Sequence, residues 1–273
     1  MVSLMSDILA NFTFGVLATF IPLFIGLFIP TAVANNAARM KVLMAFSCGI
    51  MFWFFVDVMN DAALLDVNQG FGGGIAHLLL AGLFAVGVLV LFGFEKFTIR
   101  KASRKRNISS IMGISYSIAL LVALGIGFHS MGEGVEIGSL ILYSYLTNST
   151  SDLIAAIGGF GPGVAYVLHK FLEGFVLGVF GALAKARFSR IAVLGAVSGI
   201  PTVIGITLAL WTPIDATYFF AIGAAATVYI EYKLISKFAN EEPILLRSRH
   251  ANRFLLHVPR RAISRIVPTG LIA

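Results

Sequence analysis

Apolar residues follow one another along this chain in long runs, separated by short segments that hold most of the polar and charged positions. A run of about 20 predominantly apolar residues is what an α-helix needs to cross the hydrocarbon core of a bilayer. The pattern predicts seven spanning helices, at residues 9–34, 42–59, 74–94, 108–145, 154–184, 191–211 and 217–236. We therefore expect an all-α fold, a polytopic membrane helix bundle.

The composition agrees with this pattern. Of the 273 residues, 58% are hydrophobic and only 12% are charged, whereas a soluble domain carries about 25% charged residues. The first run, residues 9–34, contains no charged residue and no A-x-A-like cleavage site, so we interpret it as a true span and not as a removable signal peptide. Residues 1–236 are expected to form the transmembrane domain.

Lys and Arg are distributed unevenly over the segments that connect the runs. Except for Lys170, all of them lie in residues 35–41, 95–107 and 185–190 or from residue 233 onward, and the alternate connections hold none. This is the positive-inside pattern, and it predicts a multi-pass protein of the cell membrane with its N-terminus outside and its C-terminal tail in the cytoplasm. The net charge of +7 is thereby explained without nucleic acid, and the basic segments are placed to contact anionic lipid.

The last part of the chain, residues 237–273, is a basic tail. Its segment FLLHVPRRAISRIVPTGLIA contains three arginines, and each would cost about 2.5–3.5 kcal/mol at the centre of a membrane helix. We therefore do not predict an eighth span there. Because basic and apolar residues are interleaved, we expect the tail to lie on the cytoplasmic membrane surface or to be disordered.

Two similar segments stand out within the apolar runs. His129–Gly138 reads HSMGEGVEIG and His169–Gly178 reads HKFLEGFVLG, so each has a histidine followed four positions later by a glutamate. Residues four apart lie on one face of a helix, and a short connection between the two spans makes them neighbours. We expect four side chains to converge near mid-membrane: His129, Glu133, His169 and Glu173.

Charged side chains are expensive at these positions. Each costs about 2.5–3.5 kcal/mol at the centre of a span, and Glu133, Glu173 and Lys170 all lie there. One interpretation is structural: Lys170 pairs with Glu173, three residues on, and holds helices together. The other is a divalent cation bound between the two helices by two imidazoles and two carboxylates. Nitrogen and carboxylate oxygen suit Zn²⁺, Fe²⁺ or Mn²⁺ better than Cu⁺ or Ca²⁺.

At these two segments the chain resembles the ZIP family of divalent-metal transporters. The family carries His-Asn/Ser-x-Pro-Glu-Gly-type motifs in its fourth and fifth membrane helices, where they contribute to a mid-membrane metal site. Segments Phe46–Asp61 and Phe220–Tyr232 are similar to each other, in keeping with the family's inverted repeat. SGIPTVIG at Ser198–Gly205 resembles the family's sixth-helix motif. The resemblance covers residues 9–236 and implies a ZIP-like bundle that transports metal.

The chain also departs from the family pattern. Many members hold two metals, and the positions that would complete the second site are here Ser130, Lys170 and Thr202. A charged lysine has no free lone pair for a metal, and its ammonium can replace the second cation beside the glutamates. The resemblance therefore implies a single metal with Lys170 as a charge substitute, or alternatively a lysine that loses its proton and senses pH. The family's eighth helix is not apparent.

Three further carboxylates lie in or near the same spans. Asp57 and Asp61 are one turn apart near the outer end of the second span, where they form a metal entrance or are ordinary helix-end carboxylates. Glu136 follows Glu133 by three positions and is either an accessory ligand or a hydrogen-bonded structural residue. The sequence leaves both choices open.

Together these features predict transmembrane transport of a divalent transition-metal cation into the cytoplasm. Zn²⁺ is the first choice, with Fe²⁺ or Mn²⁺ as alternatives, and we expect no enzyme activity, no catalytic residue and no cofactor beyond the metal substrate. The chain has no G-x-x-x-x-G-K-[ST] nucleotide motif, so gradients would supply the energy. The alternatives are a membrane-embedded metalloenzyme and a metal-binding, receptor-like protein that has lost transport. Metal ions and membrane lipid are the expected partners, and a homodimer is compatible with the sequence.

Overall fold

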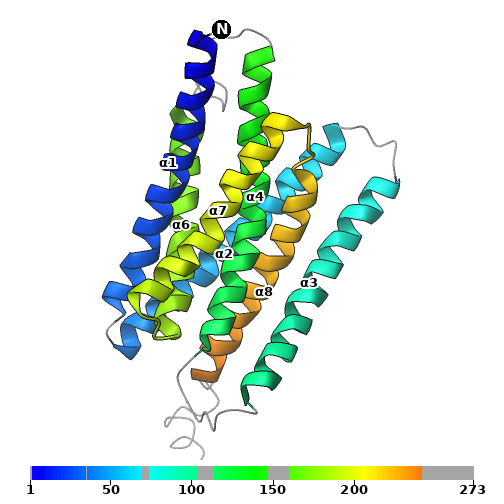
Figure 1. Cartoon of the computed structure of the whole chain (residues 1–273). Coiled ribbons are helices and arrows are strands. Elements are labelled where there is room, and N and C mark those ends of the chain that lie inside the picture. Colours follow the sequence, from blue (N-terminus) through cyan, green and yellow to red (C-terminus); the bar gives the residue numbers. More distant parts are fainter. Residues whose placement is uncertain (1, 35, 69–73, 104–113, 147–159, 242–273) are drawn as a thin grey trace, which may run out of the picture. The chain divides into compact units, whose positions relative to one another are not determined.

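Seven α-helices make up the part of the chain that the structure, a computed structural model, describes: residues 2–34, 36–68, 74–103, 114–146 and 160–241 (Figure 1). In chain order they are α1 (Val2–Val33), α2 (Ala37–Asn68), α3 (Gly74–Ser103), α4 (Tyr116–Leu146), α6 (Phe160–Leu183), α7 (Phe188–Trp211) and α8 (Thr217–Glu241). The described residues contain no strand, so the expected all-α fold is confirmed.

Each of these helices contains a stretch long and apolar enough to cross a membrane, from 20 residues in α3 to 28 in α4. This is the length and composition of a multi-pass membrane protein. Helices α2 and α3 continue past their predicted spans, to Asn68 and Ser103. An apolar run marks only the lipid-embedded part of a helix, whereas the backbone hydrogen bonds continue into its polar ends. The beginnings of two predicted spans, 108–113 and 154–159, lie outside the described residues.

The predicted tail overlaps the end of the last helix, because α8 continues to Glu241 and the tail is predicted from residue 237 onward. Its remainder, residues 242–273, lies outside the described part. The chain divides into a compact unit, Met1–Leu234, which contains the site described below, and a second unit, Ile235–Ala273.

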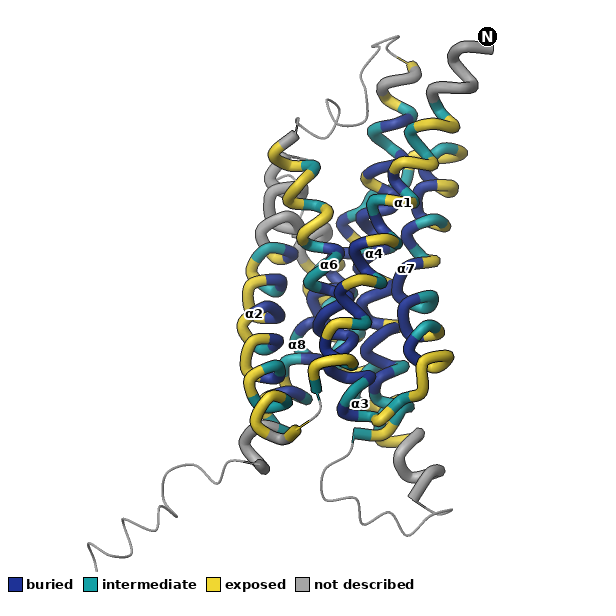
Figure 2. The backbone as a smooth tube through the Cα atoms, turned by 90° about the vertical axis from the view of Figure 1, so that its left-hand side faces the viewer, coloured by how far each residue is buried: buried dark blue, intermediate teal, exposed yellow. Residues whose placement is uncertain are grey.

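Helices α1, α4, α6 and α7 form the core of the first unit. The most extensive packing is that of α4 along α7 and of α1 along α6, and contacts of α1 with α7 and of α4 with α6 join the two pairs. In an 18-residue apolar window of each helix, 72% of the residues are buried in α4 but only 6% in α3. Figure 2 shows buried positions gathered on the inner helices and exposed ones along α2. Most residues of the α3 window therefore lie at the surface, whereas most of those in the α4 window are buried inside the bundle.

Two glycines let the paired helices approach closely. A Cβ atom on Gly134 of α4 would lie 2.1 Å from the carbonyl oxygen of Thr202 in α7, and one on Gly174 of α6 would lie 2.0 Å from the carbonyl oxygen of Leu23 in α1. Only glycine fits at such backbone-to-backbone contacts, which are typical of membrane helix pairs. Each of these glycines directly follows the glutamate of one of the two similar segments, so the closest crossings lie beside those glutamates.

Helices α2, α3 and α8 contact one another outside this core. Val58 of α2 and Phe220 and Ala224 of α8 form a buried apolar cluster. An ion pair between Glu95 and Lys233 connects α3 to α8. These two residues are 138 positions apart, and no sequence pattern relates them.

Candidate metal centre

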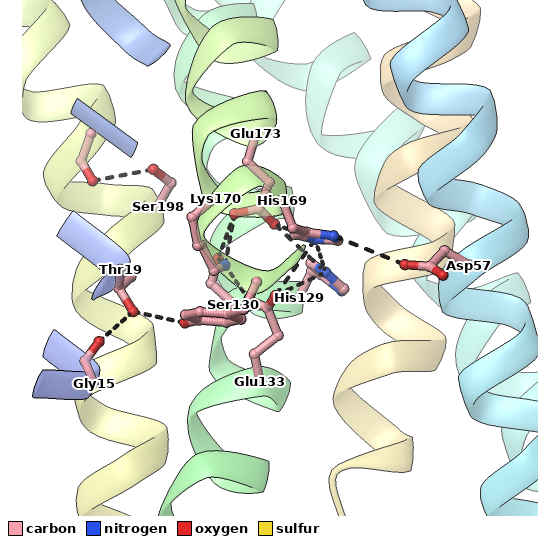
Figure 3. A network of polar contacts seen from close by, with 12 residues as sticks. Gly15, Thr19, Asp57, His129, Ser130, Glu133, His169, Lys170, Glu173 and Ser198 are labelled. Carbon is pink, nitrogen blue, oxygen red and sulfur yellow. Dashed lines mark hydrogen bonds and ion pairs between the residues drawn. The ribbon is translucent and has the colours of Figure 1, made fainter. Parts of the chain in front are cut away.

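The two similar segments bring their polar side chains together between α4 and α6 (Figure 3). His129 and Glu133 lie one turn apart on α4, and His169 and Glu173 lie one turn apart on α6. Their side chains are between 2% and 12% exposed, so the cluster is almost shielded from solvent. The convergence expected from the four-residue spacing is therefore present.

The ligand atoms of these side chains form a compact set. Nε2 of His129 lies 3.2 Å from Nε2 of His169. Oε1 of Glu133 lies 3.5 Å from Nε2 of His169 and 3.8 Å from Nε2 of His129. Oε1 of Glu173 lies 3.6 Å from Nε2 of His129 and 3.5 Å from Nε2 of His169. Donors about 2.0–2.1 Å from a tetrahedral Zn²⁺ are about 3.3 Å apart, so this spacing fits one small divalent cation.

Lys170 lies on the other side of the glutamates. Its Nζ is paired with Oε2 of Glu133, donates a hydrogen bond to Oε2 of Glu173 at 2.7 Å and donates another to Oγ of Ser130 at 2.9 Å. Two hydrogen bonds and one ion pair therefore surround the ammonium group. Each carboxylate is therefore divided, with Oε2 facing Lys170 and Oε1 facing the histidines. The sequence offered the ion pair of Lys170 and the His/Glu ligand cluster as alternative interpretations. In the structure both are present together.

Some polar atoms of the cluster are buried without a hydrogen-bond partner, among them Oε1 of Glu173 and Nδ1 of His129. Such atoms are rare in folded proteins, and each costs about 1–3 kcal/mol. Because Oε1 of Glu173 lies near Nε2 of both histidines, a cation between them would satisfy it. Two imidazoles and two carboxylates are a donor set that suits Zn²⁺ and related transition metals.

A second group of residues holds Lys170 in place. Its Nζ lies 5.9 Å from the centre of the Tyr166 ring, within cation–π distance. The hydroxyl of Tyr166 is hydrogen-bonded to Oγ1 of Thr19 in α1 at 2.7 Å, and Thr19 donates to the carbonyl oxygen of Gly15 at 2.8 Å. Sequence reasoning missed Tyr166 and Thr19, because they are uncharged, 147 positions apart and not part of any motif.

Of the further carboxylates, Asp57 of α2 lies beside the cluster. Its Oδ2 is 3.9 Å from Nδ1 of His169, and its side chain is 41% exposed, so it is accessible as well as close to a predicted ligand. Glu136 lines the cavity described next but does not belong to the four-ligand cluster. The side chain of Asp61 lies outside the described part of the chain.

A cavity of about 600 Å³ opens the cluster on one side, and His129, Glu133 and His169 form part of its lining. On α4 the lining extends from His129 toward the C-terminal end as far as Leu140, and on α6 it begins at Pro162 near the N-terminal end. The cavity therefore extends from the cluster toward the side that the charge pattern predicts to be outside.

The opposite side of the cluster is closed. The void there has a volume of only about 10 Å³, and Met51, Phe54, Ile126 and Ile230 are among its mainly apolar lining residues. A single water molecule needs about 10–15 Å³, so this void offers a hydrated ion no path. The space on this side of the cluster is therefore far smaller than the cavity on the other side.

One cluster of potential ligands is found among the described residues, and it can hold one cation. Of the positions that the family resemblance connects with a second metal, Ser130 and Lys170 bond to each other. Thr202 is buried in α7, and its Oγ1 has no hydrogen-bond partner. That only one metal binds stays a prediction.

No protein-family model, no curated protein and no solved structure matches this chain. Family and function must therefore be inferred from the sequence motifs and from the site itself. In the described part of the chain, these establish a bundle of seven helices of membrane-spanning length with a buried His/Glu cluster that could bind metal.

Proposed function

We propose that this chain is a ZIP-type carrier that moves a divalent transition-metal cation, Zn²⁺ foremost, from the outside into the cytoplasm. The observation that supports it best is the position of the four-ligand cluster, which lies midway along two spanning helices at the inner end of a one-sided cavity. A cation held permanently for structural reasons needs no such access. Transporters bind their cargo near the midplane of a helix bundle, where one side at a time is open.

Charge in the cavity favours the entry of a cation. Asp57 and Glu136 line it, and no Lys or Arg is among its described lining residues. Carboxylates in a cleft with apolar walls raise the local concentration of cations. Because Asp57 lies beside His169, it is placed to receive an arriving ion and pass it to the ligands.

Release to the cytoplasm requires the closed side to open. The apolar residues around the small void, such as Phe54 and Ile126, form a barrier that a cation cannot cross. A carrier must open this barrier while the outer cavity closes, since a path open at both ends would be a channel. In this proposal, a cluster at the inner end of the large cavity belongs to the state that loads from the outside.

The cavity volume gives the metalloenzyme alternative some support, because about 600 Å³ falls within the roughly 300–1,000 Å³ of ligand pockets. A metal-loaded enzyme would need further polar groups to orient an organic substrate. Beyond the cluster, however, the lining offers chiefly Asp57, Glu136 and Tyr166. These few polar groups suit the passage of a cation better than the binding of an organic substrate.

The test is uptake of radioactive Zn²⁺ into proteoliposomes that contain the full chain. We expect the wild type to accumulate Zn²⁺ and the double variant His129→Ala/Glu173→Ala to fall to the level of empty liposomes, because two of the four ligands are removed. Glu231→Gln, which removes a carboxylate of α8 outside the cluster, is the matched control and should retain uptake. Competition by Fe²⁺ and Mn²⁺ ranks the cargo.

Undiminished uptake by the double variant would overturn the proposal. A folded wild type that binds Zn²⁺ without carrying it would instead support the receptor-like alternative. Size-exclusion profiles of both proteins in detergent show whether each is folded.

A further inference from the structure

We infer that Lys170 sets the metal selectivity of the cluster. By holding one oxygen of each glutamate, it limits the protein to four donor atoms and so favours Zn²⁺ over cations that require more ligands, Mn²⁺ foremost. This inference deepens the proposed function and rests on it for the identity of the cargo. Its test, however, measures binding.

The first step is the division of the carboxylates. Oε2 of Glu133 and Oε2 of Glu173 are both bound to the Lys170 ammonium, which leaves one oxygen of each for a cation. A carboxylate divided in this way is a one-atom ligand, because its second oxygen is already used. With Nε2 of the two histidines, the cluster among the described residues offers four donor atoms to a cation.

The second step is that Lys170 is fixed. Its side chain is 0% exposed, so bulk solvent does not reach its donors. Ser130 accepts a hydrogen bond from the ammonium, and the Tyr166 ring, itself anchored to Thr19, lies against it. Releasing a carboxylate oxygen to a metal would leave the buried ammonium of Lys170 without one of its partners, which is energetically unfavourable.

The third step is coordination chemistry. Zn²⁺ is satisfied by four nitrogen and oxygen ligands in a tetrahedron, whereas Mn²⁺ prefers an octahedral oxygen-rich set and Ca²⁺ takes six to eight oxygens, often from bidentate carboxylates. Because Lys170 holds one oxygen of each glutamate, neither glutamate can bind a cation through both of its oxygens. A cation of higher coordination number would have to keep several waters at a cluster whose inner side is closed.

A simple charge effect makes a different prediction. The positive charge of Lys170 repels every divalent cation alike, so removing it would strengthen the binding of Zn²⁺ and Mn²⁺ by the same factor. Control of coordination number changes the ratio of the two affinities. The ratio of the dissociation constants is therefore the quantity to measure.

The experiment compares purified full-length wild type with Lys170→Met. Competition with a chelating indicator gives Kd for Zn²⁺ and Mn²⁺, and Co²⁺ reports geometry, since four-coordinate Co²⁺ absorbs visible light far more strongly than six-coordinate Co²⁺. We expect strong Co²⁺ bands in the wild type and weak ones in Lys170→Met. The ratio Kd(Mn²⁺)/Kd(Zn²⁺) should fall by about tenfold or more, the usual size of an effect on metal binding by a group that orients ligands. Lys96→Met, the same change at an exposed lysine, should alter neither readout.

Ser130→Ala provides a second, milder variant, because it removes only the third anchor of Lys170. It should lower the Kd ratio in the same direction by a smaller factor, and it decides the matter if Lys170→Met does not fold. An unchanged ratio with unchanged Co²⁺ bands, in whichever variant folds, would overturn the inference. If the wild type takes up Zn²⁺ but the variants keep its Kd ratio, this inference fails and the proposed function stands. If the ratio changes but the wild type shows no uptake, the proposed function fails and this inference stands.

Discussion

Lys170 shows, at the scale of the single residue, how the fold tolerates charge inside a membrane helix. Its ammonium is fully buried and has three partners, two of which are carboxylates. Removing one partner of a buried ion pair costs about 3–5 kcal/mol, because the other charge stays behind uncompensated. Without a cation, both glutamates depend on this one lysine.

Lys170→Met is therefore expected to lower the apparent unfolding temperature of the metal-free protein, by the equivalent of about 3–5 kcal/mol. Excess Zn²⁺ should restore much of the loss, since the cation neutralises the same carboxylates. Thermal unfolding in detergent, first with EDTA and then with Zn²⁺, measures both effects against Lys96→Met. A loss of equal size in both conditions would contradict this account.

Asp57 acts on the cluster through His169, from a different helix. Its carboxylate lies 3.9 Å from Nδ1 of that ring, and carboxylates beside ligand histidines typically contribute about tenfold to metal affinity. We expect Asp57→Asn to weaken Zn²⁺ binding by up to about this factor and Glu136→Gln to weaken it less. Calorimetric titration of both variants tests the order, and a larger effect of Glu136→Gln would make that residue the accessory ligand.

The sequence predicted the four cluster residues because their signal is local. A histidine and a glutamate four positions apart share a helix face wherever the helix lies, and the repetition of the pattern pointed to two facing helices. The support of Lys170 by Tyr166 and Thr19 has no such signal, since it depends on how α1 packs against α6. That the cluster binds metal stays a prediction.

At the scale of the helix, the crossings of α4 with α7 and of α1 with α6 fix the position of the cluster. Apolar runs predicted the helices themselves, but they say nothing about which helices pair. Gly134 and Gly174 mark the pairing, because the backbone of the partner helix contacts each of these glycines. Only the structure shows which of the many glycines are used in this way.

Gly174→Ala is expected to destabilise the protein and to weaken Zn²⁺ binding. The new Cβ would lie 2.0 Å from the Leu23 carbonyl oxygen, so α1 and α6 must separate and shift Glu173. Overpacking of this kind costs about 1–3 kcal/mol. Gly82→Ala, on α3 with nothing within 4 Å of the new atom, is the matched control. The two variants should therefore differ clearly in unfolding temperature and in Zn²⁺ affinity, measured by thermal unfolding and titration. Equal values for both variants would refute the importance of this contact.

At the scale of the whole bundle, the cluster is reached from one side. About 600 Å³ of cavity lies toward the predicted outside and about 10 Å³ of void toward the predicted inside. Hydropathy and charge predicted the spans and their orientation, but not this difference, which depends on how side chains from five helices fill the space around the cluster.

Cysteine labelling tests the asymmetry, because Cys48 is the only cysteine of the chain. In a Cys48→Ser background, a membrane-impermeant thiol reagent added outside should label Leu140→Cys, which lines the cavity. It should leave Thr227→Cys, which lines the closed void, unlabelled. Mass spectrometry of oriented vesicles gives both yields, and equal labelling would show that the closed side is open in the membrane.

In the proposed carrier, the lysine beside two glutamates also decides how the membrane potential acts. Two carboxylates and one ammonium give the metal-free cluster a formal charge of −1, and a divalent cation changes it to +1. Moving one elementary charge across a membrane potential of 100 mV changes its free energy by about 2.3 kcal/mol. If it is negative inside, it draws the loaded cluster inward and returns the empty one outward. Without Lys170 the loaded cluster would be neutral, and only the return would respond to voltage.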